Sequence, residues 1–171
     1  MLKPAHLYHR ELEMKMIDGW YKLENMYYHA YTAEYTPSLP DNNGREHHFV
    51  SVDNDDNVVG YISYHVDWQS MSAHSWGLIT FQKGNLILIK DLYTVIRNLF
   101  EKYHMNRISW NCYADNPAIR GYRYFVKKFG GKEVGYLHDA SKLLDGKLHD
   151  IVIFEILAKD YFTNSSFGKN K

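Results

Sequence analysis

Three groups of side chains have types or spacings that occur in reactive or metal-binding sites. Cys112 would be a nucleophile if a base activated its thiol, but no histidine or acid is spaced to do so, and we expect a small buried residue. His6 and His9 lie three residues apart without a third ligand close in sequence, so they do not predict a metal site. The acidic turn that begins at Asp53 starts like a calcium loop, but Val58 stands where that loop requires glycine. We therefore expect no metal.

Lys83, Gly84 and Asn85 stand directly before a segment with helical periodicity. From these residues alone, an ordinary turn is the simpler interpretation. The alternative is an anion site, because the first N–H groups of a helix are unpaired and its dipole favours negative charge. Lys83 would add a point charge there, and Gly84 would let the backbone approach a phosphate closely.

The first half of the chain predicts two helices followed by an antiparallel meander. Helix formers fill residues 4–32, with an interruption near Asp18 and Gly19, and turn residues fill a loop over residues 35–45 that is able to cover a site. Apolar-rich runs separated by polar turns then predict three strands over residues 47–53, 58–67 and 75–82.

The second half of the chain predicts a helix, a strand, a helix and a hairpin. A helical stripe begins at Ile89 and comprises Ile89, Leu92, Ile96, Leu99, Phe100 and Tyr103. Residues 107–113 alternate as a strand, and Asn116 caps a helix that begins at Pro117 and ends at Gly130 and Gly131. The inner stripe of that helix comprises Ile119, Tyr122, Val126 and Phe129. A long hairpin over residues 134–144 and 148–157 follows, and residues 163–171 form a polar, frayed tail.

This order requires a right-handed parallel crossover from the third strand to the strand over residues 107–113, so these two strands lie side by side. The chain here resembles the GNAT superfamily of N-acetyltransferases over residues 46–157. Residues 116–122, with the sequence NPAIRGY, are similar to the Asn-x-x-Ala-Ile helix start of that family, and residues 135–152 are similar to its closing hairpin. Residues 83–87, with the sequence KGNLI, are similar to a phage and Gram-positive branch. The resemblance implies an α/β (α+β) fold, in which helices flank a mixed sheet with two splayed parallel strands.

The resemblance also implies a cosubstrate, acetyl-CoA, between the splayed strands. Its pantetheine arm would lie along residues 77–82, and its pyrophosphate at the start of the next helix. The implied cofactor-binding residues are Ile79, Thr80, Phe81, Gln82, Lys83, Gly84, Asn85, Leu86 and Asn116. The loop departs from the family pattern, which has several small residues, because Gly84 is followed by apolar residues. Cofactor binding is therefore an inference from the resemblance.

The resemblance implies that Tyr122 is the general acid that protonates the departing thiolate, with Tyr124 as the fallback. Packing against the sheet is an equal alternative for Tyr122, and helix capping is the simpler role of Asn116. No general base is visible, although Glu46, His47 and His74 are eligible by position. The implied reaction is acetyl transfer to a primary amine of a small molecule or protein. An inactive CoA-binding module and an interaction domain or homodimer that uses the terminal hairpin are the alternatives.

Composition limits the other classes of function. Twenty basic residues balance twenty acidic ones, so the net charge gives the protein no general attraction to nucleic acid or to an anionic membrane surface. One cysteine allows no intramolecular disulfide, and no apolar run reaches the roughly 20 residues of a membrane span. We expect a cytoplasmic protein with one domain over residues 1–162 and a tail over residues 163–171.

Overall fold

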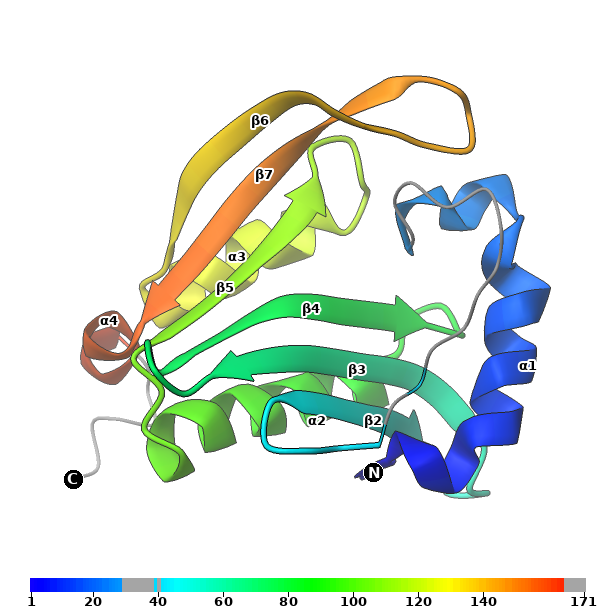
Figure 1. The fold of residues 1–171 in the computed structure, drawn as a ribbon, viewed down its shortest axis with the longest axis horizontal. Helices are drawn as coiled ribbons and strands as arrows, with labels where there is room; N and C mark the ends of the chain where they lie inside the picture. The colour runs from blue at the N-terminus through cyan, green and yellow to red at the C-terminus, as the bar shows by residue number, and fades with distance from the viewer. Residues whose placement is uncertain (29–38, 40, 165–171) are drawn as a thin grey trace.

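The computed structural model describes residues 1–28, 39 and 41–164. A seven-stranded mixed sheet has the order β1-β2-β3-β4-β5-β7-β6. Its strands are β1 (Leu2–Pro4), β2 (Glu46–Val52), β3 (Val58–Asp67), β4 (Ser72–Thr80), β5 (Arg107–Tyr113), β6 (Lys132–Lys142) and β7 (Leu148–Leu157). Only the neighbours β4 and β5 are parallel; the other five neighbouring pairs are antiparallel. The predicted mixed sheet, meander and closing hairpin are confirmed (Figure 1).

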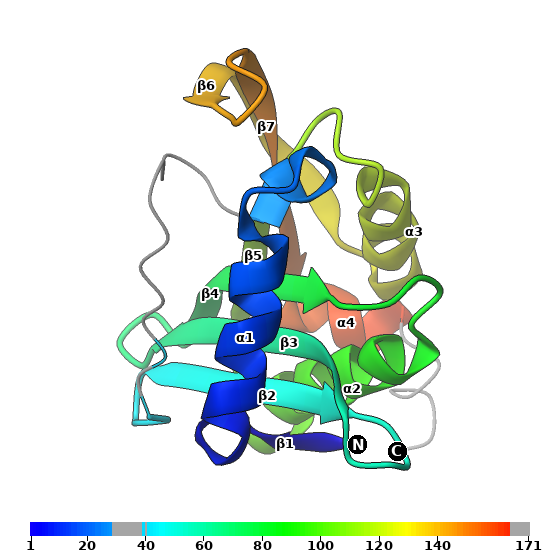
Figure 2. The ribbon, with the colours of Figure 1, turned by 90° about the vertical axis from the view of Figure 1, so that its right-hand side faces the viewer.

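The helical segments are η1 (Ala5–Tyr8), α1 (His9–Trp20), η2 (Leu23–Tyr28), α2 (Leu86–Arg97), the π-helical η3 (Asn98–Lys102), α3 (Ile119–Phe129) and α4 (Ala158–Asn164). α2 and α3 lie on the same side of the sheet, and α1 stands across the ends of the strands (Figure 2). One apolar core lies between the sheet and α2, α3 and α4, and includes Ile62, Phe100 and Phe154. A smaller core around Leu12 attaches α1 to β2 and β3.

The N-terminal region differs from the prediction in two ways. α1 continues through Asp18 and Gly19 to Trp20, because the Gly19 carbonyl still accepts hydrogen bonds from the Lys22 N–H and from the Asn25 side chain. The second predicted helix is a 3-10 segment that ends at Tyr28, and the rest of that prediction lies outside the described residues. β1 was not predicted, because three residues that end in proline carry no strand pattern of their own.

The predicted helical stripe of α2 is partly wrong. The helix begins at Leu86 rather than Ile89, and Leu88 is buried in place of Ile89, which is 48% exposed. Gly60 makes this possible, because a Cβ atom there would lie 2.8 Å from Leu88 Cδ1. The wider π turn of η3 then alters the period, so the predicted stripe member Tyr103 is 43% exposed.

Other element boundaries shift where polar side chains form turns. β4 begins at Ser72, three residues before the predicted start, because Asp67 accepts hydrogen bonds from Gln69 and Ser70 and closes a compact turn. α3 begins at Ile119 rather than Pro117, and its Gly130 C-terminus, in a left-handed conformation with φ of 75°, is confirmed. α4 continues two residues into the predicted tail, and residues 165–171 lie outside the described part. The predicted loop over residues 35–45 is described only at Leu39 and residues 41–45.

Candidate active site

A cleft opens where β4 and β5 separate. These strands pair only at Ser72–Arg107 and Ala73–Ile108, although β4 has nine residues and β5 has seven. Beyond these pairs the two strands splay apart, and Figure 1 shows the gap between them widening toward their ends. The resulting cleft has a volume of about 830 Å³ and is lined from both sides, by β4 with the start of α2 and by β5 with the start of α3. The predicted splayed pair is therefore present.

The loop from β4 to α2 forms one lip of the cleft. Asn85 is the N-cap of α2: its Oδ1 accepts from the Leu88 N–H at 2.9 Å, and its Nδ2 donates to the Val59 carbonyl at 2.6 Å. Asn85 is 6% exposed, so this cap joins α2 to β3 inside the protein. Gly84 has φ of 63°, and no atom lies within 4 Å of the position of a Cβ there. The backbone is therefore open to a large group at this point.

The predicted cofactor residues divide into two sets. Six of them line the cleft, namely Thr80, Gln82, Lys83, Gly84, Asn85 and Asn116. Ile79 and Phe81 point the other way and pack against the core beneath α1, where Lys15 Nζ lies 5.9 Å from the Phe81 ring centroid. Leu86 is 68% exposed outside the cleft lining. The side chains of Ile79, Phe81 and Leu86 therefore do not line the cleft.

Tyr122 lines the cleft from α3 and packs against Trp110 and Phe154, with ring centroids 6.0 and 6.1 Å apart. Burial raises the pKa of its phenol, and the nearby Cys112 thiol adds to the shift. The phenol therefore holds its proton at neutral pH. Tyr122 therefore has the packing contacts that were one of its two predicted roles, and it also lines the cleft, whereas Tyr124 is 67% exposed.

The remaining polar groups of the β5 lip are used within the protein. Asn116 Oδ1 accepts from the Ala118 N–H at 2.9 Å, which makes a turn before α3 instead of the predicted direct cap. Cys112 is 6% exposed, and burial raises the pKa of its thiol to about 12. A thiol with this pKa is not a nucleophile at neutral pH, which agrees with the expected buried residue.

Two tyrosines of η2 cross the mouth of the cleft. The Tyr28 hydroxyl donates to the Thr80 carbonyl at 3.2 Å on the β4 lip, and the Tyr27 hydroxyl donates to the Asp115 carbonyl at 3.4 Å on the β5 lip. Glu24, on the same segment, contributes the only carboxylate to the cleft lining within the described residues. The role of this segment in the cleft was not predicted from the sequence, where the adjacent tyrosine pair after the helix break is its one signal.

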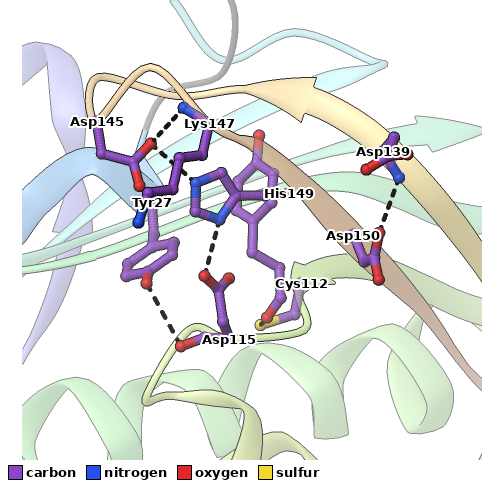
Figure 3. A network of polar contacts seen from close by, with 9 residues as sticks. Tyr27, Cys112, Asp115, Asp139, Asp145, Lys147, His149 and Asp150 are labelled. Atoms are coloured by element: carbon purple, nitrogen blue, oxygen red, sulfur yellow. Dashed lines mark hydrogen bonds and ion pairs between the residues drawn. The ribbon is translucent and has the colours of Figure 1, made fainter.

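His149 holds the β5 lip in a charged clamp that was also missed. Its Nδ1 lies 2.8 Å from Asp115 Oδ2 and its Nε2 lies 3.0 Å from Asp145 Oδ1 (Figure 3). The hydrogen bond to Asp145, together with the Asp115 contacts, raises the pKa of His149, and the same contact lowers the pKa of Asp145. Each ring nitrogen faces a carboxylate, so the protonated imidazole donates to both, and the raised pKa favours this charged form. His149 is therefore not a free base, and the clamp ties the β6–β7 turn to the loop before α3.

The three predicted base candidates lie away from the cleft lining. Glu46 and His47 are on β2, where the His47 ring stacks on Tyr64 at 4.9 Å and burial lowers its pKa. His74, near the start of β4, contacts the Ser75 hydroxyl at 2.9 Å. Across residues 1–28, 39 and 41–164, no group of three or more His, Cys, Asp or Glu side chains is arranged to hold a metal ion. No helix in these ranges is long and apolar enough to cross a membrane.

Comparison with known proteins identifies the fold. No protein-family model and no curated protein matches this sequence. The structure is similar to spermidine/spermine N-acetyltransferase SpeG from Vibrio cholerae in complex with manganese ions, with a TM-score of 0.61 and 20% identity over 72% of each chain. A chimera of Vibrio cholerae SpeG and hSSAT gives a TM-score of 0.59 and 21% identity, over 71% of this chain and 70% of the other. The chain therefore has the fold of the GNAT N-acetyltransferases.

Proposed function

We propose that this protein is an acetyl-CoA-dependent N-acetyltransferase that acts on a primary amine, with a small-molecule amine as the first class to test. The observation that carries the proposal is the β4–β5 gap with the N-terminus of α2 at its mouth. The similar solved structures are named as spermidine N-acetyltransferases, which supports an amine acceptor. The likeness of residues 83–87 to a phage and Gram-positive branch remains part of the proposal.

The β4 lip fits the phosphate part of the cosubstrate. Gly84 leaves the backbone open, Lys83 provides the only cationic side chain of the cleft lining in the described chain, and α2 begins directly after them. A helix N-terminus and a lysine together favour a pyrophosphate. Bound acetyl-CoA would supply the thioester whose C–S bond breaks as the new N–C bond forms.

Tyr122 would supply the proton that the departing sulfur needs. Its raised pKa keeps the phenol protonated at neutral pH, so that a proton is present in the cleft when the thiolate forms. Glu24 and the η2 tyrosines face the same cleft from the side opposite α3, where they would receive the amine. A carboxylate beside aromatic rings suits a cationic alkylamine.

Calorimetric titration with acetyl-CoA tests the donor site. We expect micromolar affinity, on the order of −8 kcal/mol, for the unmodified chain. Gly84→Asp is expected to weaken binding at least tenfold, because a carboxylate would lie beside the pyrophosphate. Gly84→Asn is the matched control, since asparagine has the same shape, tolerates a positive φ and is neutral.

Equal affinities for the two variants would contradict the placement of the phosphate loop. No binding of acetyl-CoA to any form would overturn the enzymatic proposal itself. Once binding is established, release of the CoA thiol in the presence of spermidine and simple alkylamines measures the reaction. A chain that binds acetyl-CoA but releases no thiol with any amine would favour the alternative of an inactive CoA-binding module.

A further inference from the structure

A small apolar chamber lies beneath the sheet at the closed end of the β4–β5 gap. Leu92 and Ile96 of α2, Phe125 of α3 and Ile108 and Trp110 of β5 contribute to its wall. Ile108 belongs to one of the two residue pairs that join β4 to β5, so the chamber lies at the point where the strands begin to separate.

The chamber and the cleft are adjacent. Four residues line both spaces, namely Trp76, Leu78, Asn111 and Tyr122. Tyr122, the proposed proton donor to the sulfur, therefore stands at the boundary between them. A group attached to the thioester carbon on the side away from the sulfur would lie next to this boundary.

The chamber has room for more than an acetyl methyl group. Its volume is about 50 Å³. One water-sized group needs about 10–15 Å³, so the chamber accommodates at least about three such groups. Its wall is mainly apolar, and its polar groups belong to Asn111, Tyr122 and two tryptophans. An unfilled apolar space costs stability, because the atoms around it lose contacts on one side. An aromatic side chain at position 92 would fill it, yet the chain has leucine there.

We propose that this chamber receives the end of a donor acyl chain longer than acetyl, so that the protein also binds and transfers straight-chain acyl groups of about four carbons from their CoA thioesters. This inference rests on the proposed function and extends its donor specificity. The chemistry balances as for acetyl: the N–C bond forms, the C–S bond breaks, and the proton that the amine loses balances the one that the thiolate gains from Tyr122. No further reactant is needed.

Calorimetric titration of the full chain with acetyl-CoA, propionyl-CoA, butyryl-CoA and octanoyl-CoA tests the proposal without requiring turnover. Each methylene group buried in the chamber is expected to tighten binding about fourfold, so butyryl-CoA, with two more methylenes, should bind about fifteenfold more tightly than acetyl-CoA. Octanoyl-CoA exceeds the available room and should lose this gain.

Leu92→Phe fills the chamber from α2, at a residue that does not itself line the cleft. It should abolish the advantage of butyryl-CoA and leave acetyl-CoA affinity unchanged. Leu7→Phe, at a site 64% exposed on η1, is the matched control and should retain the full chain-length series. If Leu92→Phe does not fold, the series on the unmodified chain still decides the question. Butyryl-CoA binding no tighter than acetyl-CoA would overturn the chamber proposal alone, whereas failure of every CoA ester to bind would overturn the proposed function as well.

Discussion

The two lips of the cleft are held by different kinds of interaction. Asn85 fixes the β4 lip with neutral hydrogen bonds from one buried side chain. The clamp of Asp115, His149 and Asp145 fixes the β5 lip with charged ones. A neutral cap is insensitive to pH, whereas the clamp depends on the charge of an imidazole. The lip proposed to bind the donor is therefore held in one geometry over a wide pH range, and the lip beside Tyr122 is not.

The sign of the pH effect follows from the direction of each pKa shift. The pKa of His149 is raised in the folded protein, so its contribution to stability is fully present below the unfolded value of about 6.5 and is lost as pH rises through the folded value. The pKa of Asp145 is lowered, so its contribution is present above about 3.9 and is lost as pH falls through the folded value. The clamp is strongest between about pH 4 and pH 6.5.

The largest expected effect is a loss of catalysis at the β5 lip that leaves cosubstrate binding unchanged. Tyr122→Phe should lower kcat at least 100-fold, because the departing thiolate loses its proton donor, while calorimetric affinity for acetyl-CoA stays the same. Tyr124→Phe removes a hydroxyl that is exposed on the same helix, and should change neither value. A kcat that falls only in Tyr124→Phe would transfer the role to the fallback residue.

Asn85→Ala should destabilise the protein by about 2–3 kcal/mol, since it removes the cap of α2 and leaves the Val59 carbonyl without this donor. Urea denaturation measures the change, with Asn54→Ala in the exposed β2–β3 turn as the control. The loss should be the same at pH 6 and pH 8. A loss that varies with pH would break the contrast between a neutral and a charged lip.

His149→Asn should cost about 2 kcal/mol near pH 6, because the two carboxylates lose a charged donor. The stability difference between the unmodified chain and this variant should shrink as pH rises above 6.5, which denaturation midpoints from pH 5 to pH 9 will show. His138→Asn is the control, since His138 is exposed and lies 3.6 Å from Asp150. Parallel pH profiles for the unmodified chain and His149→Asn would show that the imidazole is neutral.

The elements around the cleft are predictable because their patterns are local. The apolar-rich run of residues 58–67 and the alternation of residues 107–113 give the bounds of β3 and β5 as observed. The clamp is not predictable, because His149 meets Asp115 from 34 residues away and only the bend of the β6–β7 hairpin brings in Asp145. Likewise, Tyr27 and Tyr28 reach the lips across separations of 88 and 52 residues.

The cofactor residues were predicted as a continuous run, whereas a strand presents alternate residues to each side. Thr80 lines the cleft, and its neighbours Ile79 and Phe81 face the core under α1. Applying the two-residue period to this run would have removed both from the set. The exposure of Leu86 could be predicted only from the exact start of α2, because the cap at Asn85 directs the next side chain outward.

The short junction between β4 and β5 also has a mechanical consequence. Antiparallel ladders hold β1 to β4 together as one plate and β5 to β7 as another, and the strand pairing between the plates consists of two residue pairs. β1 and α4 lie at the two ends of the described chain; β1 belongs to the first plate, and α4 packs on β7 of the second (Figure 2). A force that pulls the two plates apart would act on this short pairing, and a molecule seated in the gap would contact both plates.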